Sequence, residues 1–165
     1  MDATFRWIES SALSVWTRES TSLLAYPAIL SAHTIGMAFA AGVNVAIALR
    51  LLGVSAGLPI AELRRYSSVL WSGFWVNAAS GVMLLIAYPT KAMTNPVFYL
   101  KLTLIAIGLA IFAVVTRRLA REPALEGWTP ARKKLVGVVA LVSWGGAITA
   151  GRLLAYTYRH LMAGH

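Results

Sequence analysis

Hydrophobic residues in this chain form four long segments that contain no Asp, Glu, Lys or Arg. The segments cover residues 20–49, 66–90, 102–116 and 135–151. A helix that crosses a bilayer needs about twenty mostly apolar residues, and the first two segments reach that length alone. The third reaches it when it begins near Asn95 and includes Lys101, and the fourth when it continues through Arg152 to about Tyr158. The pattern therefore predicts four membrane-spanning helices.

We expect these helices to cover about residues 26–50, 67–89, 96–117 and 133–158. Pro and Gly residues separate them, and short connections of this kind favour antiparallel neighbours. The predicted fold is an all-α integral membrane protein. It is an antiparallel four-transmembrane-helix bundle that forms a single membrane domain over residues 1–165.

Residues 1–22 have a different pattern, in which charged and aromatic residues are mixed. Phe5, Ile8, Ala12 and Val15 recur at the spacing of one helix face. The segment lacks the basic start and short apolar core of a signal peptide. It predicts an amphipathic interfacial helix, anchored by aromatic side chains at the headgroup level and packed over one mouth of the bundle.

The composition is typical of a membrane protein. Hydrophobic residues make up 58% of the chain and charged residues 13%, about half the charged share of soluble proteins. A soluble domain with this composition would expose large apolar patches to water. The chain has no cysteine, which excludes disulfides, thiolate metal sites and cysteine nucleophiles.

The net charge of +9 predicts an orientation. Nine cations fall in the two loops on one side of the predicted bundle, and the positive-inside rule places that side in the cytoplasm. They are Arg50, Arg64, Arg65, Arg117, Arg118, Arg121, Arg132, Lys133 and Lys134. Both termini then lie outside, in the periplasm, if the protein belongs to a bacterial inner membrane. These cations can bind anionic lipids, whereas no basic groove with interleaved aromatic residues predicts nucleic-acid binding.

No Asp or Glu lies in a predicted span, because all six acidic residues are in loops or near the N-terminus. Intramembrane carboxylate relays and Ser/His/Asp catalysis are therefore excluded, and we do not expect an independent enzyme. Three nitrogen-bearing side chains do lie in spans, namely His33, Lys101 and Arg152. Counting along the helices places all three roughly 7–10 Å below the outer interface, level with residues 80–83 of the second helix.

Three environments suit cations in a layer without acids. Glu9 or Glu19 can fold over the mouth of the bundle and pair with Lys101 or Arg152, since intramembrane charges tend to pair. The two cations can also extend to the outer headgroups. The third environment is a bound anionic group, such as a haem propionate, a quinone headgroup or a lipid phosphate.

His33 allows two interpretations. It can donate a hydrogen bond to a backbone carbonyl or to a Ser or Thr of a neighbouring helix. Alternatively it is a metal ligand, to haem b iron or chlorin magnesium, with Met37 or Met83 as the nearest second ligand for haem. His33 and Met37 share a helix face and also suit Cu(I), although Met37 is more typical of ordinary packing.

Small and amide side chains predict close helix packing. Gly and Ala residues around Gly36, Gly81 and Gly146 permit neighbouring helices to approach closely. Asn44 and Asn77 are buried amides, for which we expect hydrogen bonds between helices.

Several short motifs, each present once, follow one another along nearly the whole chain. They are WIESSAL at residues 7–13, RES at 18–20, YP at 26–27 with His33 six residues later, RLLG at 50–53, NP at 95–96 with KL at 101–102, and GRLLAY at 151–156. In these motifs the chain resembles an uncharacterised bacterial family of small four-helix integral membrane proteins, a domain of unknown function. The resemblance implies that His33, Lys101 and Arg152 belong to the family pattern, but it implies no activity.

We therefore expect a small membrane subunit that works with other membrane protein subunits in respiratory or photosynthetic electron transfer. His33 would be the axial ligand or hydrogen-bond donor to a haem b, chlorin or quinone, and Lys101 and Arg152 would neutralise an anionic group. One alternative is a purely structural or assembly subunit without a cofactor. The other is transport of copper or a small solute, with Cu(I) at His33 and Met37.

Overall fold

The computed structural model describes residues 2–55, 57, 65–121, 125 and 127–162, and within them all regular secondary structure is helical. Four helices are long and apolar enough to cross a membrane, as predicted. These are α3 (Tyr26–Leu51), α4 (Ser67–Ala87), α6 (Pro96–Arg121) and α7 (Pro130–Met162). Three shorter helices accompany them: α1 (Asp2–Glu9), α2 (Ala12–Glu19) and α5 (Pro89–Met93).

The helix ends differ from the prediction by a few residues. α6 continues to Arg121, because basic side chains can extend a helix beyond its apolar part. α7 begins at Pro130, because a proline suits the first position of a helix. α4 ends at Ala87, since Tyr88 precedes a proline and takes a non-helical conformation. Pro89 then begins α5, which connects α4 to α6.

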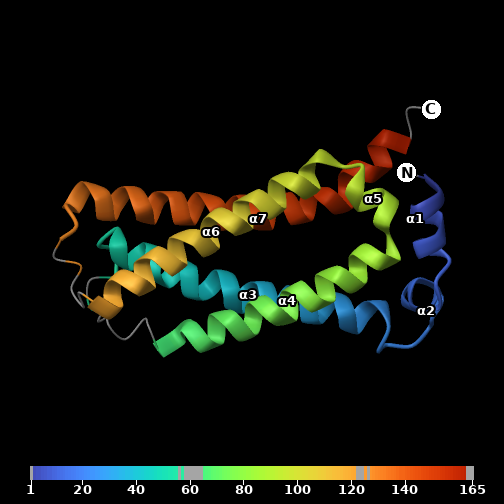
Figure 1. The fold of residues 1–165 in the computed structure, drawn as a ribbon, viewed down its shortest axis with the longest axis horizontal. Coiled ribbons are helices and arrows are strands. Elements are labelled where there is room, and N and C mark those ends of the chain that lie inside the picture. The colour runs from blue at the N-terminus through green and yellow to red at the C-terminus, as the bar shows by residue number, and fades with distance from the viewer. Residues whose placement is uncertain (1, 56, 58–64, 122–124, 126, 163–165) are drawn as a thin grey trace.

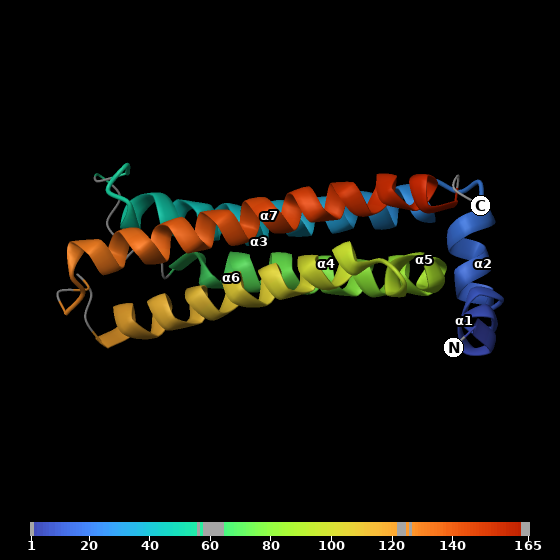
Figure 2. The same cartoon turned by 90° about the horizontal axis from the view of Figure 1, so that it is seen from above.

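The four long helices run along the long axis of the molecule (Figure 1). α3 and α6 begin at the end that carries α1, α2 and α5, whereas α4 and α7 begin at the opposite end (Figures 1 and 2). α3 packs along α4 and α7, and α6 packs along α7. In the view of Figure 1 the ribbons of α4 and α6 separate toward α5, whereas in Figure 2 they overlap there.

Two glycines bring the backbones of α3 and α4 into contact. A Cβ atom on Gly36 would lie 2.6 Å from the backbone nitrogen of Asn77 and 2.7 Å from the carbonyl oxygen of Gly73. A Cβ atom on Gly73 would lie 2.9 Å from the carbonyl oxygen of Gly36. Backbone cannot move aside as a flexible side chain can, so the close approach predicted at Gly36 is confirmed.

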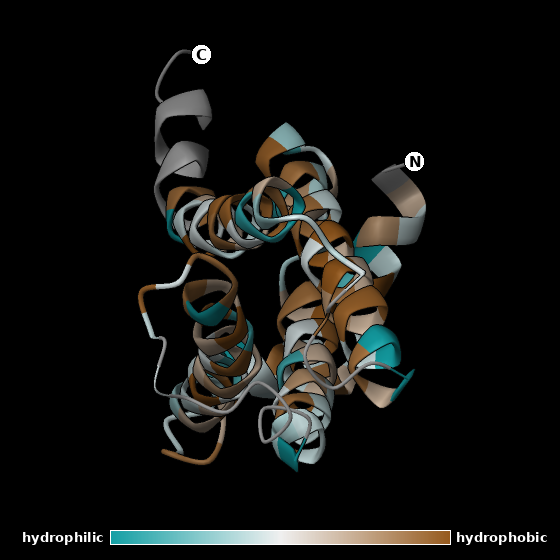
Figure 3. Cartoon of the chain, turned by 90° about the vertical axis from the view of Figure 1, so that its left-hand side faces the viewer, coloured by the Kyte–Doolittle hydropathy of each residue, from teal (hydrophilic) through white to brown (hydrophobic). Residues whose placement is uncertain are grey.

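A hydrophobic cluster closes the other end of the bundle, where α4 and α7 begin. Seen from this end, hydrophobic residues occur on all four long helices (Figure 3). Leu70 and Val115 are fully buried in the cluster. Its members come from α3, α4, α6 and the residues before α7, and they are Ile47, Leu51, Leu70, Phe112, Val115, Leu119, Leu125 and Trp128. This end of the bundle is therefore packed with apolar side chains.

The prediction of one continuous N-terminal helix is wrong, because the segment forms two helices. Ser11 has an extended backbone conformation and caps α2, where its Oγ accepts a hydrogen bond from the Ser14 nitrogen at 3.4 Å. Ser10 Oγ donates to the Trp7 carbonyl oxygen at 2.9 Å. Serine side chains that bond nearby backbone in this way end one helix and start another. α1 and α2 lie across the end of the bundle (Figure 2), as expected for this segment.

Hydrogen bonds fasten α1 and α2 to the corner between α4 and α5. Ser14 Oγ and Arg18 Nη1 both donate to the carbonyl oxygen of Ala87, at 3.5 and 3.4 Å. The Thr90 nitrogen donates to Glu9 Oε1 at 3.4 Å, and Arg18 Nη2 donates to the Glu9 carbonyl oxygen at 2.9 Å. A cation at the C-terminus of α4 also suits the negative end of that helix's dipole.

Candidate functional site

His33 on α3 and Asn77 on α4 form a reciprocal pair of hydrogen bonds. His33 Nδ1 lies 3.0 Å from the carbonyl oxygen of Asn77. Asn77 Nδ2 donates to the carbonyl oxygen of His33 at 2.7 Å. Each side chain thus bonds the main chain of the other residue, close to the point where Gly36 contacts α4. The expectation that Asn77 bonds between helices is confirmed.

The shortest contact of the His33 ring favours the tautomer with the proton on Nδ1, although Asn77 Nδ2 also lies 3.3 Å from that nitrogen. A carbonyl oxygen can only accept a hydrogen bond, so Nδ1 carries the proton and donates to Asn77. Ser80 Oγ lies 3.2 Å from the same nitrogen and donates its own proton to the Val76 carbonyl oxygen at 2.6 Å, which leaves its lone pairs toward the ring. Nε2 of the neutral ring is therefore an acceptor. The expectation that His33 bonds a backbone carbonyl and a Ser or Thr is met.

Lys101 on α6 supplies the donor for Nε2. Its Nζ atom lies 3.3 Å from His33 Nε2, and an ammonium group can only donate. Both side chains are half-buried. The predicted common layer of His33 and Lys101 is thus a direct contact that joins α6 to α3.

Two glycines make room for this contact, and sequence reasoning gave neither a role in it. A Cβ atom on Gly81 would lie 3.1 Å from His33 Cε1, so the ring packs against the bare backbone of α4. Gly151 on α7 lies against Lys101, where a Cβ would be 3.6 Å from Cε and 3.7 Å from Nζ. The spacing of Asn77 and Gly81, four residues apart on one face of α4, is the signal that could have identified the first of them.

The contact between His33 and Lys101 lies toward the end of the bundle that carries α5. Lys101 is near the start of α6 (Figure 1). All four long helices contribute to this polar layer, since α7 supplies Gly151 against Lys101.

No acidic side chain meets Lys101 among the residues that the structure describes, where His33 is its hydrogen-bond partner. Glu9 instead accepts from the Thr90 nitrogen, and Glu19 is exposed on α2. The predicted alternative in which Glu9 or Glu19 pairs with Lys101 is therefore wrong. Among the described residues the ammonium group has one hydrogen-bond partner, which leaves two N–H groups.

Arg152 does not join this site. Its side chain is exposed, although the adjacent Gly151 faces Lys101. Consecutive residues of a helix point about 100° apart, so a residue at the right depth can still point outward. The exposed position fits the expectation that Arg152 extends toward the outer headgroups.

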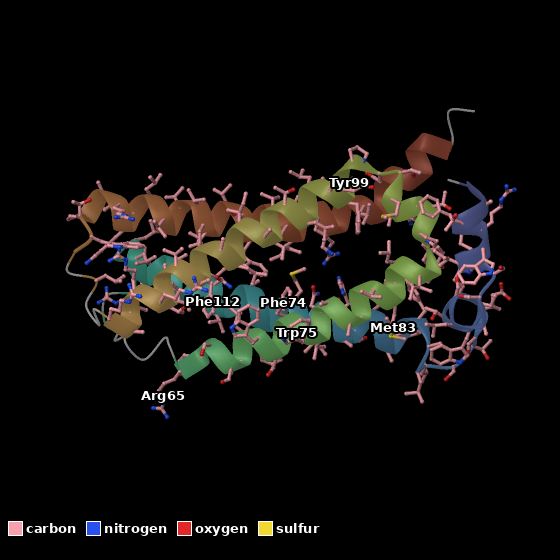
Figure 4. The ribbon with its side chains drawn as sticks, viewed as in Figure 1. Arg65, Phe74, Trp75, Met83, Tyr99 and Phe112 are labelled. Atoms are coloured by element: carbon pink, nitrogen blue, oxygen red, sulfur yellow. The ribbon has the colours of Figure 1, made fainter. Side chains whose placement is uncertain are left out.

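Neither predicted methionine lies within bonding distance of the His33 ring nitrogens in the described part of the chain. Met37 packs against the buried cluster of Ala40, Ala41 and Trp144, which is the packing role that was expected as its alternative. Met83 is half-buried on α4 (Figure 4). Asn44 donates to the Ala40 carbonyl oxygen of its own helix at 2.9 Å, so the prediction that it bonds another helix is wrong.

Comparisons with known proteins indicate no function for this chain. No protein-family model, no curated protein and no solved structure matches this chain.

Proposed function

We propose that this chain is a small subunit of a membrane electron-transfer assembly and that Lys101 and His33 bind the headgroup of a quinone. The observation that carries this proposal is the 3.3 Å contact between Lys101 Nζ and His33 Nε2, with no carboxylate against the ammonium group among the described residues. Charged side chains are rare in spans and mark ligand or ion sites when they occur there. The two remaining N–H groups of Lys101 suit an acceptor such as a quinone carbonyl oxygen.

The proposal places the chain in a bacterial inner membrane as an antiparallel bundle with both termini outside. The four long apolar helices support this, because in water their exposed faces would leave large hydrophobic side chains such as Ile35, Trp75 and Leu100 in solvent. The charge distribution supports the orientation, since the cytoplasmic side then carries most of the cations. Exposed apolar faces also leave room for other subunits.

The geometry favours a quinone over a haem, a chlorin or copper. A metal would have to bind His33 at Nε2, because Nδ1 carries the proton that bonds Asn77. Nε2 is already the acceptor for Lys101, so metal binding would require the ammonium group to leave.

A purely structural role is the second candidate, and a specific observation favours it. The reciprocal bonds between His33 and Asn77 hold α3 to α4 without any ligand. In that case His33 and Lys101 would only hold the helices together. The purified protein in detergent would then bind no more quinone than the same detergent without protein.

Titration of the purified protein with a short-chain benzoquinone tests the proposal. Lys101→Met removes the ammonium group and keeps most of the apolar stem, and Arg152→Met is its control at the same depth. A hydrogen bond to a charged group contributes about 1.5–3 kcal/mol, so we expect Lys101→Met to weaken binding at least about tenfold. Arg152→Met should leave affinity within about twofold.

The outcomes separate the candidates. Equal affinity of the two variants, or no quinone binding by the wild type, would reject the quinone site. A Soret or chlorin absorbance that disappears in His33→Ala would favour a haem or chlorin instead. Stoichiometric copper that is lost in Met37→Ala would favour copper transport.

A further inference from the structure

The bundle end opposite the quinone site carries a dense group of basic side chains. They belong to the last turns of α6 and the first turns of α7, and they are Arg117, Arg118, Arg121, Arg132, Lys133 and Lys134. The two helix ends are held together, because Leu119 of α6 and Trp128 before α7 pack in the same hydrophobic cluster. The residues described in these two helix ends include no acid, but Glu122 and Glu126 lie between them in the sequence, and Arg118 and Lys133 each have an interaction partner. We call this group the α6–α7 basic cluster.

Arg132 is fixed in place within the cluster. Its guanidinium carbon lies 4.7 Å from the centre of the Trp128 ring, and that ring is only 4% exposed. A buried indole cannot move freely, so the guanidinium group that stacks on it is oriented. Stacking occupies one face of the guanidinium and leaves its N–H edge available. That edge matches two oxygens of a phosphate group.

The position of these cations in α7 favours an anion. Arg132 and Lys133 lie in the first turn of α7, with Lys134 directly after them, and the first turn contains no acidic residue. The N-terminal end of a helix carries partial positive charge, so adjacent cations repel it and each other. Arg132 has no ion-pair or hydrogen-bond partner for its guanidinium group among the described residues. A bound anion would relieve this repulsion.

The depth of the cluster suits a lipid headgroup, a point that rests on the membrane insertion proposed above. Twenty residues of helix cross about 30 Å of hydrocarbon, and from Pro96 this distance ends near Thr116. Arg117 and Arg121 therefore reach the headgroup layer, and α7 begins in the same layer. Phosphates of the cytoplasmic leaflet lie at this level, where anionic lipids attract basic residues.

We propose that the α6–α7 basic cluster binds the phosphate of an anionic phospholipid in the cytoplasmic leaflet, with Arg132 as its central ligand. The Trp128 ring orients Arg132 toward the phosphate, and Arg121 at the end of α6 supplies a second cation. The bound lipid bridges the end of α6 and the start of α7. This site is distinct from the quinone site at the other end of the bundle.

Lipid binding to delipidated protein in detergent, followed by native mass spectrometry, tests this site. The probes are phosphatidylglycerol, which is anionic, and phosphatidylethanolamine, which has no net charge. Each basic residue near a charged lipid contributes about fivefold in affinity, so Arg132→Gln should weaken phosphatidylglycerol binding at least about fivefold. Arg132→Lys keeps the charge but loses the two-pronged geometry, and its affinity should fall between those of the wild type and Arg132→Gln.

Arg65→Gln is the matched control, because Arg65 is an exposed cation at the same end of the molecule, before α4 (Figure 4). It should change phosphatidylglycerol binding by less than about twofold. An equal loss in Arg65→Gln and Arg132→Gln would show diffuse surface attraction and would overturn the site. Equal binding of the two lipids would also overturn it.

Two further measurements identify the source of the phosphate and keep the two proposals separate. Inorganic phosphate at equal concentration should not displace phosphatidylglycerol, and displacement would overturn the lipid assignment. Quinone affinity should be unchanged in Arg132→Gln. A loss of lipid binding with intact quinone binding supports the lipid site alone, whereas Lys101→Met tests the quinone site alone.

Discussion

His33 and Asn77 each donate a side-chain hydrogen bond to the backbone carbonyl oxygen of the other residue, at 3.0 and 2.7 Å. The exchange joins two helices and also sets the tautomer of the histidine ring. Nε2 then faces Lys101 as an acceptor. The contact between α3 and α4 thereby makes His33 Nε2 a hydrogen-bond acceptor for Lys101 on α6.

Asn77→Ala should destabilise the protein through the loss of one bond between helices. Such bonds in membrane proteins contribute about 0.6 kcal/mol on average and up to about 1.7 kcal/mol. Asn44→Ala is the matched control, since Asn44 is also a buried amide and, among the described residues, it bonds its own helix. Reversible unfolding in mixed detergent measures both variants. If Asn44→Ala costs as much as Asn77→Ala, the bond between α3 and α4 carries no stability of its own.

Gly36→Ala should separate α3 from α4, because the new methyl group would meet backbone at 2.6 Å. Overpacking of this kind typically costs about 1–3 kcal/mol, and we expect the midpoint of unfolding to fall accordingly. Gly42→Ala on the same helix meets nothing within 4 Å, and alanine is favoured over glycine in a helix by about 1 kcal/mol. Gly42→Ala should therefore be neutral or stabilising. A matching loss in both variants would argue against close packing at Gly36.

Lys101→Met should leave the protein as stable as the wild type, or make it more stable. A charged side chain costs about 2.5–3.5 kcal/mol at the centre of a span and less near its end, where Lys101 lies, so the cost is comparable to the value of one hydrogen bond within the membrane. Thermal unfolding of the detergent-solubilised protein, measured without quinone, checks this balance. A clear fall in the unfolding temperature would mean that Lys101 stabilises the fold, and it would favour the structural role over ligand binding.

The absence of cysteine allows a direct test of orientation. Thr4→Cys on α1 and Ala131→Cys at the start of α7 place single thiols at opposite ends of the molecule, and both positions are exposed. In intact spheroplasts, a maleimide that cannot cross membranes should label Thr4→Cys. Ala131→Cys should react after permeabilisation. The reverse labelling pattern would place the basic cluster outside and would contradict the proposed topology.

The long helices could be predicted because they depend on composition over many residues. An apolar segment of sufficient length predicts a span, and a proline close to its end limits the error to a few residues. The N-terminal segment was harder, because the hydrogen bonds of Ser10 and Ser11 interrupt a pattern that reads as one helix. The level of a residue along the bundle could also be predicted, since it requires only counting residues from the helix end. His33 and Lys101, which were predicted at one level, are in contact.

What counting along a helix could not provide is direction around its axis. Arg152 has the depth of Lys101, but Gly151 rather than Arg152 faces the site. Asn44 and Asn77 are both buried amides, and only tertiary packing decides which of them reaches another helix. The role of Gly81 depends in the same way on where the His33 ring lies. These relationships arise from the packing of specific helix faces.

The hydrogen bonds that fasten the N-terminal segment have a consequence for the order in which the protein is made. Ser14 and Arg18 leave the ribosome long before Ala87, their common acceptor, which lies 73 and 69 residues further along the chain. Glu9 is synthesised 81 residues before Thr90, which donates a hydrogen bond to it. During synthesis α1 and α2 therefore have no docking partner until α3 and α4 are complete. A nascent chain stalled before Ala87 would carry this amphipathic segment undocked, exposed to the proteases and chaperones that survey incomplete proteins.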